Sequence, residues 1–232
     1  MTEAARNLAT PQSDAADSGA SLARADWIAA ARTLLVAEGV DAVKVTRLAE
    51  ALGVTRGSFY WHFADRADLL DALLELWERL NTRAVIEAAE GALDLTTGIL
   101  SLFDVWVDVA RFDPALDGAM RDWARRSAKV RKAVEAADDA RVRAIAALFT
   151  RSGYDATEAF IRARIIYFTQ IGYYALGIRE TLMQRLGYLE GYFDGFTGRK
   201  LPAEIAEAHR ARHMRLKARR AGDTSMRRRR SS

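Results

Sequence analysis

Apolar residues recur at every third or fourth position along most of this chain, a spacing that places them on one face of an α-helix. The first 22 residues lack a sustained apolar period. No segment alternates between apolar and polar residues as a half-buried strand would, and the short apolar run at residues 165–168 lies inside a longer helical period. The pattern therefore predicts an all-α protein.

Glycine and proline positions divide this pattern into a series of helices. Gly39 follows the first helix, Gly153 follows a long one, and Pro114 suits a first helical position. The expected helices run over residues 24–38, 45–52, 56–62, 65–81, 82–90, 95–111, 114–126, 128–151, 156–179 and 181–197. Three short helices thus come first, and a set of longer helices follows.

The chain accordingly divides into four parts. Residues 1–22 are small and polar, and we expect them to be disordered. The three short helices form one unit at residues 23–66, and the longer helices form a second unit at residues 67–200. The Arg-rich segment 201–232 is expected to be a basic, solvated tail.

Charge is distributed unevenly along the chain. The whole sequence carries 35 Lys and Arg against 31 Asp and Glu, a net charge of +4. Residues 209–232 contain nine Arg and one Lys against one Asp, a net of +9, so residues 1–208 carry about −5. The basic balance is a property of the tail, and a nucleic-acid site in the body must be inferred from local chemistry.

Composition excludes several kinds of site. The chain has no cysteine, which excludes disulfides, cysteine zinc sites and a cysteine nucleophile. It lacks the uncharged apolar run of roughly 18 residues that a membrane span needs, and its first residues do not have the pattern of a secretory signal. We therefore expect a soluble cytoplasmic protein.

A helix-turn-helix pattern lies between residues 45 and 63. Gly53 supplies a left-handed turn after the second helix, and Thr55 is placed to cap the third by accepting a backbone N–H. Phe59 and Phe63 are four residues apart and share one face, so both rings are expected to pack into a small core. The neighbouring residues then point outward and form a short polar and aromatic surface that fits a DNA major groove.

Residues 45–73, VTRLAEALGVTRGSFYWHFADRADLLDAL, closely resemble the DNA-binding end of TetR-type transcriptional regulators. The matching positions stand in one register and are Leu48-Ala49, Leu52-Gly53-Val54-Thr55, Gly57, Phe59-Tyr60, His62-Phe63 and Arg66. Lys44 departs from the family pattern, which often has Ser or Thr there, and it offers a further cation to phosphate. The resemblance implies that residues 23–66 bind DNA and that residues 67–200 bind an effector and dimerise.

The resemblance also implies roles for individual residues of the first unit. The expected DNA contacts are Lys44, Thr46, Arg47, Thr55, Arg56, Gly57, Ser58, Tyr60, Trp61, His62 and Arg66. Tyr60 and His62 would bind phosphates, whereas Arg56, Ser58 and Trp61 would reach base edges. For the charged members the alternative is an ordinary solvated side chain, and for Trp61 it is packing against the fourth helix.

Beyond the fourth helix the resemblance is loose, and it is limited to the helix count and to Phe112-Asp113-Pro114 and Asp122-Trp123-Ala124. In the family this half dimerises and often encloses a small-molecule pocket. The expected pocket residues are Phe103, Trp106, Met120, Trp123, Tyr167, Phe168 and Gln170. They provide large apolar surfaces and one amide, which suit a mostly apolar ligand. Each of them has ordinary core packing as its alternative.

Small residues mark a candidate dimer interface. Gly187, Gly191 and Gly195 recur at every fourth position. The helices at 156–179 and 181–197 are therefore expected to form a two-fold interface. The expected interface residues are Gly172, Gly177, Gly187, Tyr188, Gly191, Tyr192 and Gly195. The alternative is that these glycines break the last helix into turns.

Catalytic chemistry has little support in the sequence. His209 and His213 are one helical turn apart, but no acidic cluster accompanies them in the sequence, so we expect both to be solvated and no metal site to form. No glycine-rich phosphate loop, nucleophile elbow or paired-acid arrangement is recognisable. We therefore expect neither an enzyme nor a bound cofactor.

The favoured hypothesis is a homodimeric, sequence-specific transcriptional regulator, a repressor that a small and mostly apolar ligand releases from a pseudo-palindromic DNA operator. The alternative is an all-helical interaction protein that binds nucleic acid nonspecifically through its basic tail. A third class, an all-α enzyme, would need an activity that survives loss of the first 64 residues. Substitution of Tyr60 or Arg56 would distinguish the first two classes, because only the first depends on those side chains.

Overall fold

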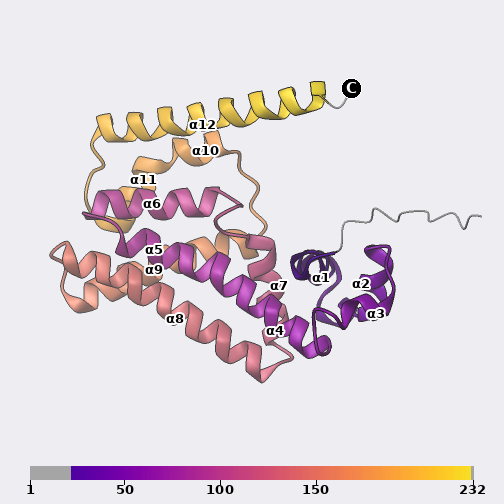
Figure 1. Ribbon diagram of the computed structural model, residues 1–232. Coiled ribbons are helices and arrows are strands. Elements are labelled where there is room, and N and C mark those ends of the chain that lie inside the picture. Colours follow the sequence, from indigo (N-terminus) through magenta and orange to yellow (C-terminus); the bar gives the residue numbers. More distant parts are fainter. Residues whose placement is uncertain (1–21, 231–232) are drawn as a thin grey trace, which may run out of the picture.

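The computed structural model describes the backbone of residues 22–230 and the side chains of residues 22–219. Over these residues the chain forms helices joined by short loops and contains no strand, which confirms the all-α prediction (Figure 1). The expected disordered segment falls almost entirely on residues 1–21, which lie outside the described residues. No helix in the described part of the chain is both long enough and apolar enough to cross a membrane.

The first helices form a small unit, hereafter the head (residues 22–65). Its elements are α1 (Arg24–Glu38), the 3₁₀ turn η1 (Val40–Ala42), α2 (Val45–Ala51) and α3 (Arg56–Phe59). The remaining helices form the body, which begins with α4 (Arg66–Trp77), the π-helical turn η2 (Glu78–Thr82) and α5 (Arg83–Glu90). It continues with α6 (Leu95–Val107), α7 (Pro114–Ala124), α8 (Ala128–Arg151), α9 (Ala156–Ala175), α10 (Leu182–Gly187), α11 (Leu189–Thr197) and α12 (Ala203–Arg230).

One helical rod connects the head to the body, because α4, η2 and α5 follow one another without a break from residue 66 to residue 90. Its first turn is capped, since Asp65 Oδ1 accepts a hydrogen bond of 2.9 Å from the backbone N–H of Asp68. In Figure 1 the rod runs from the head, drawn in indigo, into the centre of the body.

Two apolar cores hold these helices together. The head core contains Trp27, Phe59 and Phe63, and it extends beneath α7, where Met120 is fully buried. Trp27 of α1 is fully buried, and its ring packs edge-on against Phe59 at 5.3 Å. The body core lies among α5, α6, α8, α9 and α11, and at Gly98 an added Cβ would clash with the side chain of a residue on α8.

Several helices end earlier than the sequence predicts. Helix α9 ends at Ala175, because Gly177 has a left-handed backbone (φ +64°) and its N–H bonds to the carbonyl of Tyr174. The expected helix at 181–197 is two helices, α10 and α11, which meet at Tyr188. The prediction of a single helix there was wrong, although Gly191 and Gly195 do lie inside α11.

The expectation of a solvated tail is wrong for the first turns of this segment, although most of its described residues are exposed. Residues 203–230 form the single helix α12, which lies along α6, α10 and α11 at the top of Figure 1. Its described part buries Ala206, His209 and His213 against the body. Arg210 adds an ion pair with Glu190 of α11. The many arginines of this segment made it read as solvated, although Ala206, His209 and His213 form one buried face of α12.

The contact between α12 and α6 centres on Asp104. Its Oδ1 lies 2.6 Å from His213 Nε2 and 3.2 Å from His209 Nε2, and Arg212 bonds to Oδ2. The expectation that both histidines are solvated and lack a carboxylate was therefore wrong. Burial alone would raise the pKa of Asp104, but the adjacent imidazole of His209 and the guanidinium of Arg212 lower it to about 2. Burial lowers the pKa of His213 below its ordinary value.

Candidate DNA-binding surface, pocket and head–body junction

The turn between α2 and α3 has the geometry of a helix-turn-helix connection. Gly53 adopts a left-handed backbone (φ +67°), and the N–H groups of Gly53 and Val54 bond to the carbonyls of Glu50 and Ala49 at 3.1 and 2.9 Å. Both bonds satisfy carbonyls that would otherwise be free at the end of α2. The turn therefore sets the direction in which the following segment leaves the head core.

Helix α3 is shorter than the expected helix at 56–62, because it ends at Phe59 and residues 60–62 form turns. The N–H of Tyr60 donates to the carbonyl of Gly57, and the N–H of His62 donates to the carbonyl of Phe59. These bonds span three residues, as in a 3₁₀ turn, rather than the four of an α-helix. Thr55 occupies the N-cap position with an extended backbone, but its hydroxyl makes no cap hydrogen bond, so the expected cap is not formed. The start of α3 is held instead by the bond from Ser58 N–H to the Thr55 carbonyl at 3.1 Å.

Phe59 and Phe63 are the anchors of this segment, as the sequence predicts. Their exposed fractions are 0% and 2%, and the two rings stack at 5.2 Å. With these rings buried, the residues around them must face outward: Tyr60 is 62% exposed and Trp61 is 87% exposed. Trp61 therefore does not pack against the fourth helix.

The other expected DNA contacts differ in how far they are exposed. Lys44, Thr46, Thr55, Arg56 and Gly57 are exposed. Ser58 and His62 are half-buried. None of these seven residues makes a side-chain ion pair within the described part of the chain.

Two of the expected DNA contacts already have partners inside the protein. Arg47 forms a two-bonded ion pair with Glu38, at 2.8 and 2.7 Å, on the surface of the head. Arg66 donates to the carbonyls of Val43 and Val40 at 2.5 and 2.6 Å, and so fastens the start of α4 to the end of η1. The guanidinium of Arg66 thus stabilises the head.

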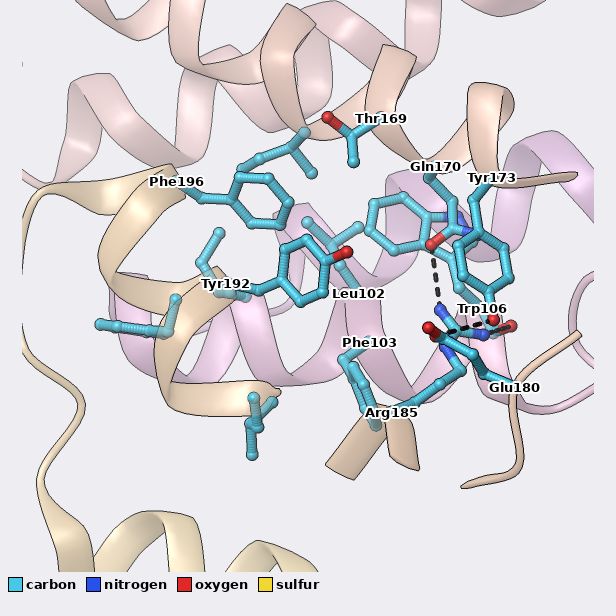
Figure 2. Close-up of a pocket in the computed structure, with 14 residues that line it drawn as sticks. Leu102, Phe103, Trp106, Thr169, Gln170, Tyr173, Glu180, Arg185, Tyr192 and Phe196 are labelled. Carbon is cyan, nitrogen blue, oxygen red and sulfur yellow. Dashed lines mark hydrogen bonds between the residues drawn. The ribbon is translucent and has the colours of Figure 1, made fainter. Parts of the chain in front are cut away.

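A mostly apolar pocket lies in the body between α6, α9, α10 and α11, and its free space is about 60 Å³ (Figure 2). The lining residues are Ile99, Leu102, Phe103, Trp106, Ile166, Thr169, Gln170, Tyr173, Glu180, Arg185, Leu189, Tyr192, Phe193 and Phe196. Ligands of drug size typically occupy ~300–1,000 Å³. A ligand of that size would have to displace side chains to enter.

Polar groups gather at one end of this pocket. Arg185 donates to Gln170 Oε1 at 3.1 Å and to the carbonyl of Trp106 at 3.2 Å, as Figure 2 shows. The amide Nε2 of Gln170 and the indole Nε1 of Trp106 are buried and lack a hydrogen-bond partner among the described residues. One cation and two unused donors therefore converge at the same end.

The structure brings three of the seven expected pocket residues together, namely Phe103, Trp106 and Gln170. Met120 lies in the head core, and Trp123 lines a separate groove between the end of α1 and α7. Phe168 is half-exposed on α9, and the buried Tyr167 faces away from the pocket into a polar network. Arg185 and Glu180, which also line the pocket, were missed because nothing in their local sequence pattern marks them.

The expected interface glycines lie mainly on open surface. An added Cβ at Gly172, Gly187, Gly191 or Gly195 would meet nothing within 4 Å. Tyr188 and Tyr192 are about half-exposed beside them. The exposed apolar residues of α9 are Phe160, Ile161, Ile165 and Phe168. Gly177, by contrast, ends α9 rather than lying on a helix face.

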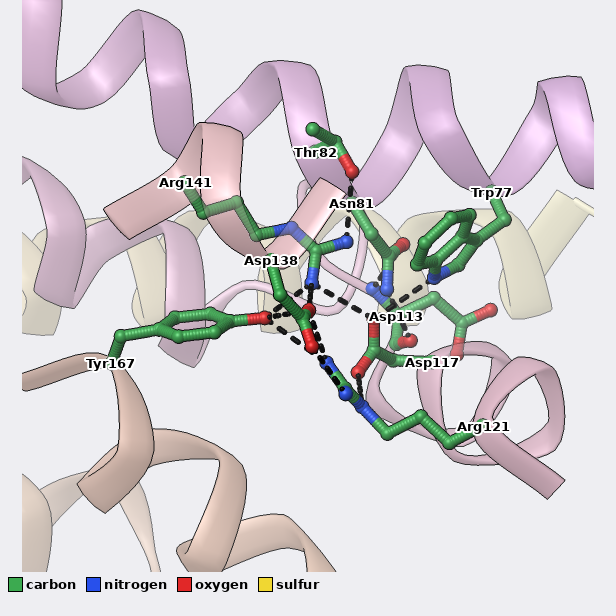
Figure 3. Close-up of polar contacts among 9 residues, drawn as sticks. All are labelled: Trp77, Asn81, Thr82, Asp113, Asp117, Arg121, Asp138, Arg141 and Tyr167. Atoms are coloured by element: carbon green, nitrogen blue, oxygen red, sulfur yellow. Dashed lines mark hydrogen bonds and ion pairs between the residues drawn. The ribbon is translucent and has the colours of Figure 1, made fainter. Parts of the chain in front are cut away.

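A buried polar network joins the rod to α7, α8 and α9 (Figure 3). Arg141 of α8 is 0% exposed and donates to Tyr167 Oη at 2.7 Å, to Thr82 Oγ1 at 2.8 Å and to Asp117 Oδ1 at 3.3 Å. Burial alone would raise the pKa of Asp117, but the charges of Arg141 and Arg121 lower it below its ordinary value. The network contains two cations, Arg121 and Arg141, which both pair with the carboxylates of Asp117 and Asp138.

Asp113 connects this network to the head. Its backbone N–H and carbonyl pair with the side-chain amide of Asn81 in η2, at 3.2 and 2.8 Å. Its carboxylate caps α7 through the N–H of Leu116 and accepts a 2.7 Å hydrogen bond from Arg32 Nε of α1. One aspartate thus contacts the head, the rod and α7.

Residues 28–73 match the family model described as bacterial regulatory proteins of the tetR family. The transcriptional regulator TtgR of Pseudomonas putida is 44% identical over 52 residues, which cover 22% of this chain and 25% of TtgR. The class A tetracycline repressor from transposon 1721 of Escherichia coli is 50% identical over 48 residues, which cover 21% of this chain and 22% of the repressor.

These curated relatives match this chain over only about a quarter of their own length. Among solved structures, the fatty acid degradation regulator FadR of Bacillus halodurans has a TM-score of 0.56 at 18% identity, over 77% of this chain and 97% of FadR. A transcriptional regulator of Rhodococcus sp. Rha1 has a TM-score of 0.55 at 19% identity, over 76% of this chain and 95% of that protein. The structural matches extend the likeness of fold to the body.

Proposed function

We infer that this chain, which belongs to the tetR family of bacterial regulatory proteins, binds a DNA operator through its head and regulates transcription as a homodimer. The observation that carries this function is the exposed surface formed by α3 and the turn after it. Its outward residues are the ones expected at DNA, and its buried phenylalanines hold them in place. The alternative of an interaction protein with a nonspecific basic tail is not favoured.

Different side chains of this surface would serve affinity and sequence choice. Arg56 is exposed and free to form two hydrogen bonds with a guanine edge, which typically discriminates by about 1–3 kcal/mol. Phosphate oxygens would instead bind to Lys44, Tyr60 and His62. Such contacts fix the position of the protein along the DNA without selecting a sequence. Trp61 projects farthest into solvent, so we propose that it contacts DNA as an apolar side chain.

We propose that the homodimer forms through α9 and α11. The exposed apolar residues Ile161, Ile165 and Phe168 follow one face of α9, and the open glycines of α11 let a second helix approach closely. Apolar side chains of this kind gain stability when a second subunit covers them. A two-fold axis here would place two heads for a pseudo-palindromic operator.

The pocket suits an effector with an apolar body and an acceptor group at one end. Arg185, Gln170 Nε2 and Trp106 Nε1 would bind that acceptor, and the aromatic walls would cover the apolar body. Because the free space is small, ligand entry must shift side chains of α6, α9 or α11. Such a shift changes DNA affinity only by the ligand's differential affinity for the two arrangements, and we propose that it releases the operator.

Selection of binding sites from a random pool of double-stranded DNA tests the DNA-binding function. We expect a pseudo-palindromic consensus, and light scattering at micromolar concentration should give the mass of a dimer. Enrichment of no sequence would contradict the operator function, whereas a monomeric mass would contradict the interface. A variant that ends at Arg219 serves as the control, because it lacks the RRRR segment but keeps the described face of α12. It should select the same consensus.

Thermal unfolding with matched ligands tests the effector chemistry. We expect decanoate to raise the melting temperature more than decanol does, and decylamine to have no effect, because the cation at this end of the pocket is Arg185. The Arg185→Gln variant should lose the preference for the carboxylate while keeping its fold. Equal effects of the three ligands on the wild-type protein would contradict the proposed acceptor end.

A further inference from the structure

We propose that Asp104, His209 and His213 form a binding site for one divalent transition-metal ion, of which Zn²⁺ is the best-suited probe. The three side chains come from α6 and α12, and their ligand atoms all lie within 4.8 Å of one another. His209 and His213 are one turn apart on α12, so both imidazoles project from the same face of that helix. Neither the proposed operator binding nor the effector pocket uses these three residues.

The donor atoms are already turned toward a common point. Asp104 Oδ1 lies 2.6 Å from His213 Nε2 and 3.2 Å from His209 Nε2. Tetrahedral zinc with bonds of about 2.0–2.2 Å places its ligand atoms about 3.3 Å apart. The His209 distance already fits, and the His213 distance would need to widen by about 0.7 Å.

A second observation favours a ligand at this point. The Nε2 atom of His209 is buried and has no hydrogen-bond partner among the described residues, although it faces the carboxylate. The side chain of His209 is 5% exposed, that of His213 is 9% exposed and that of Asp104 is 14% exposed. A metal ion would give the unused nitrogen of His209 a partner. It would also lie between the two imidazoles and the carboxylate oxygen that both of them now approach.

The surroundings of the cluster support a metal site with three protein ligands and one position left for water. Phe103 packs edge-on against both imidazole rings, at 5.8 and 5.9 Å, and restricts their rotation. Arg212 covers the outer side of Asp104 and is 47% exposed, so its guanidinium is free to swing into water when a cation binds. Two imidazoles and a carboxylate suit zinc and its first-row neighbours better than Ca²⁺ or Mg²⁺, which prefer oxygen ligands.

Metal bound here would fasten α12 to α6. The same Phe103 lines the effector pocket from its other side, so the ion would also hold one wall of that pocket. Both consequences follow from geometry and do not require that the chain bind DNA.

Zinc titration of the untagged, metal-free protein, with a chromophoric chelator as competitor, tests the site. We expect one Zn²⁺ per chain, a higher melting temperature with zinc, and visible absorption typical of four-coordinate Co²⁺ after cobalt substitution. His209→Asn, His213→Asn and Asp104→Asn should each weaken zinc binding at least tenfold. The absence of saturable binding by the wild-type protein would overturn the proposal.

Two control variants separate ligation from indirect damage. His62→Gln removes the third histidine of the chain, which lies in the head, and should bind zinc like the wild-type protein. Arg212→Gln disturbs the same ion pair but removes no proposed ligand, so it should keep the site. If Arg212→Gln lost zinc as completely as the histidine variants, or if Asp104→Asn bound it unchanged, the three-ligand site would be refuted.

Discussion

Replacing Arg141 by methionine is expected to lower the free energy of unfolding by about 3–5 kcal/mol. The guanidinium is fully buried and bonds to Tyr167, Thr82 and Asp117, so its removal leaves these polar groups without a partner. Methionine keeps a long apolar side chain and limits the cavity. Arg121 still forms ion pairs with Asp117 and Asp138 in this variant. The loss of stability should therefore be smaller than if both carboxylates were left without a cation.

Denaturant unfolding followed by circular dichroism measures this loss as a lower midpoint. Arg143→Met is the matched control, because Arg143 lies on the same helix and is exposed. We expect that change to stay within about 0.5 kcal/mol. An unchanged midpoint for Arg141→Met would mean that the buried network contributes nothing to the fold.

Replacing Arg56 by alanine is expected to weaken binding to the selected operator by tenfold to a hundredfold, which corresponds to about 1–3 kcal/mol. The same change should relax the preference for one base pair in each half-site, since Arg56 is the exposed arginine of α3. Fluorescence anisotropy with the operator and with single-base variants measures both effects.

Two companion variants assign the roles. Lys44→Gln should weaken binding to all sequences alike and reduce the slope of log affinity against log salt by about 1, as expected for a lost phosphate contact. Arg143→Ala, on the body, should bind like the wild-type protein. If Arg56→Ala kept full affinity and full preference, the assignment of α3 to base recognition would be wrong.

The head was predictable from sequence because its determinants are local. Gly53 marks the turn, and Phe59 and Phe63 mark the buried face, within a span that one helical turn and one loop connect. The length of α3 was overestimated, because the helix ends at Phe59 and the chain continues in three-residue steps, which apolar periodicity does not mark.

The body was less predictable because its chemistry depends on distant contacts. His209 and His213 look solvated within an Arg-rich segment, and the partner that buries them, Asp104, lies more than a hundred positions earlier. The fully buried Arg141 likewise reads as an ordinary surface charge until α7, α9 and η2 surround it. Helical periodicity locates most of the helices, but it does not give their rotation against one another.

The π-helical turn η2 has a consequence for how the protein tolerates change. A π turn contains one residue more than an α turn, and one residue is worth about 100° of rotation around a helix. The apolar stripe of α4 can therefore face the head core while that of α5 faces a different side, within one unbroken rod. The direction of the head relative to the body is thus set by the helical register, so inserting or deleting one residue along residues 66–90 would rotate the head by about 100° against the body.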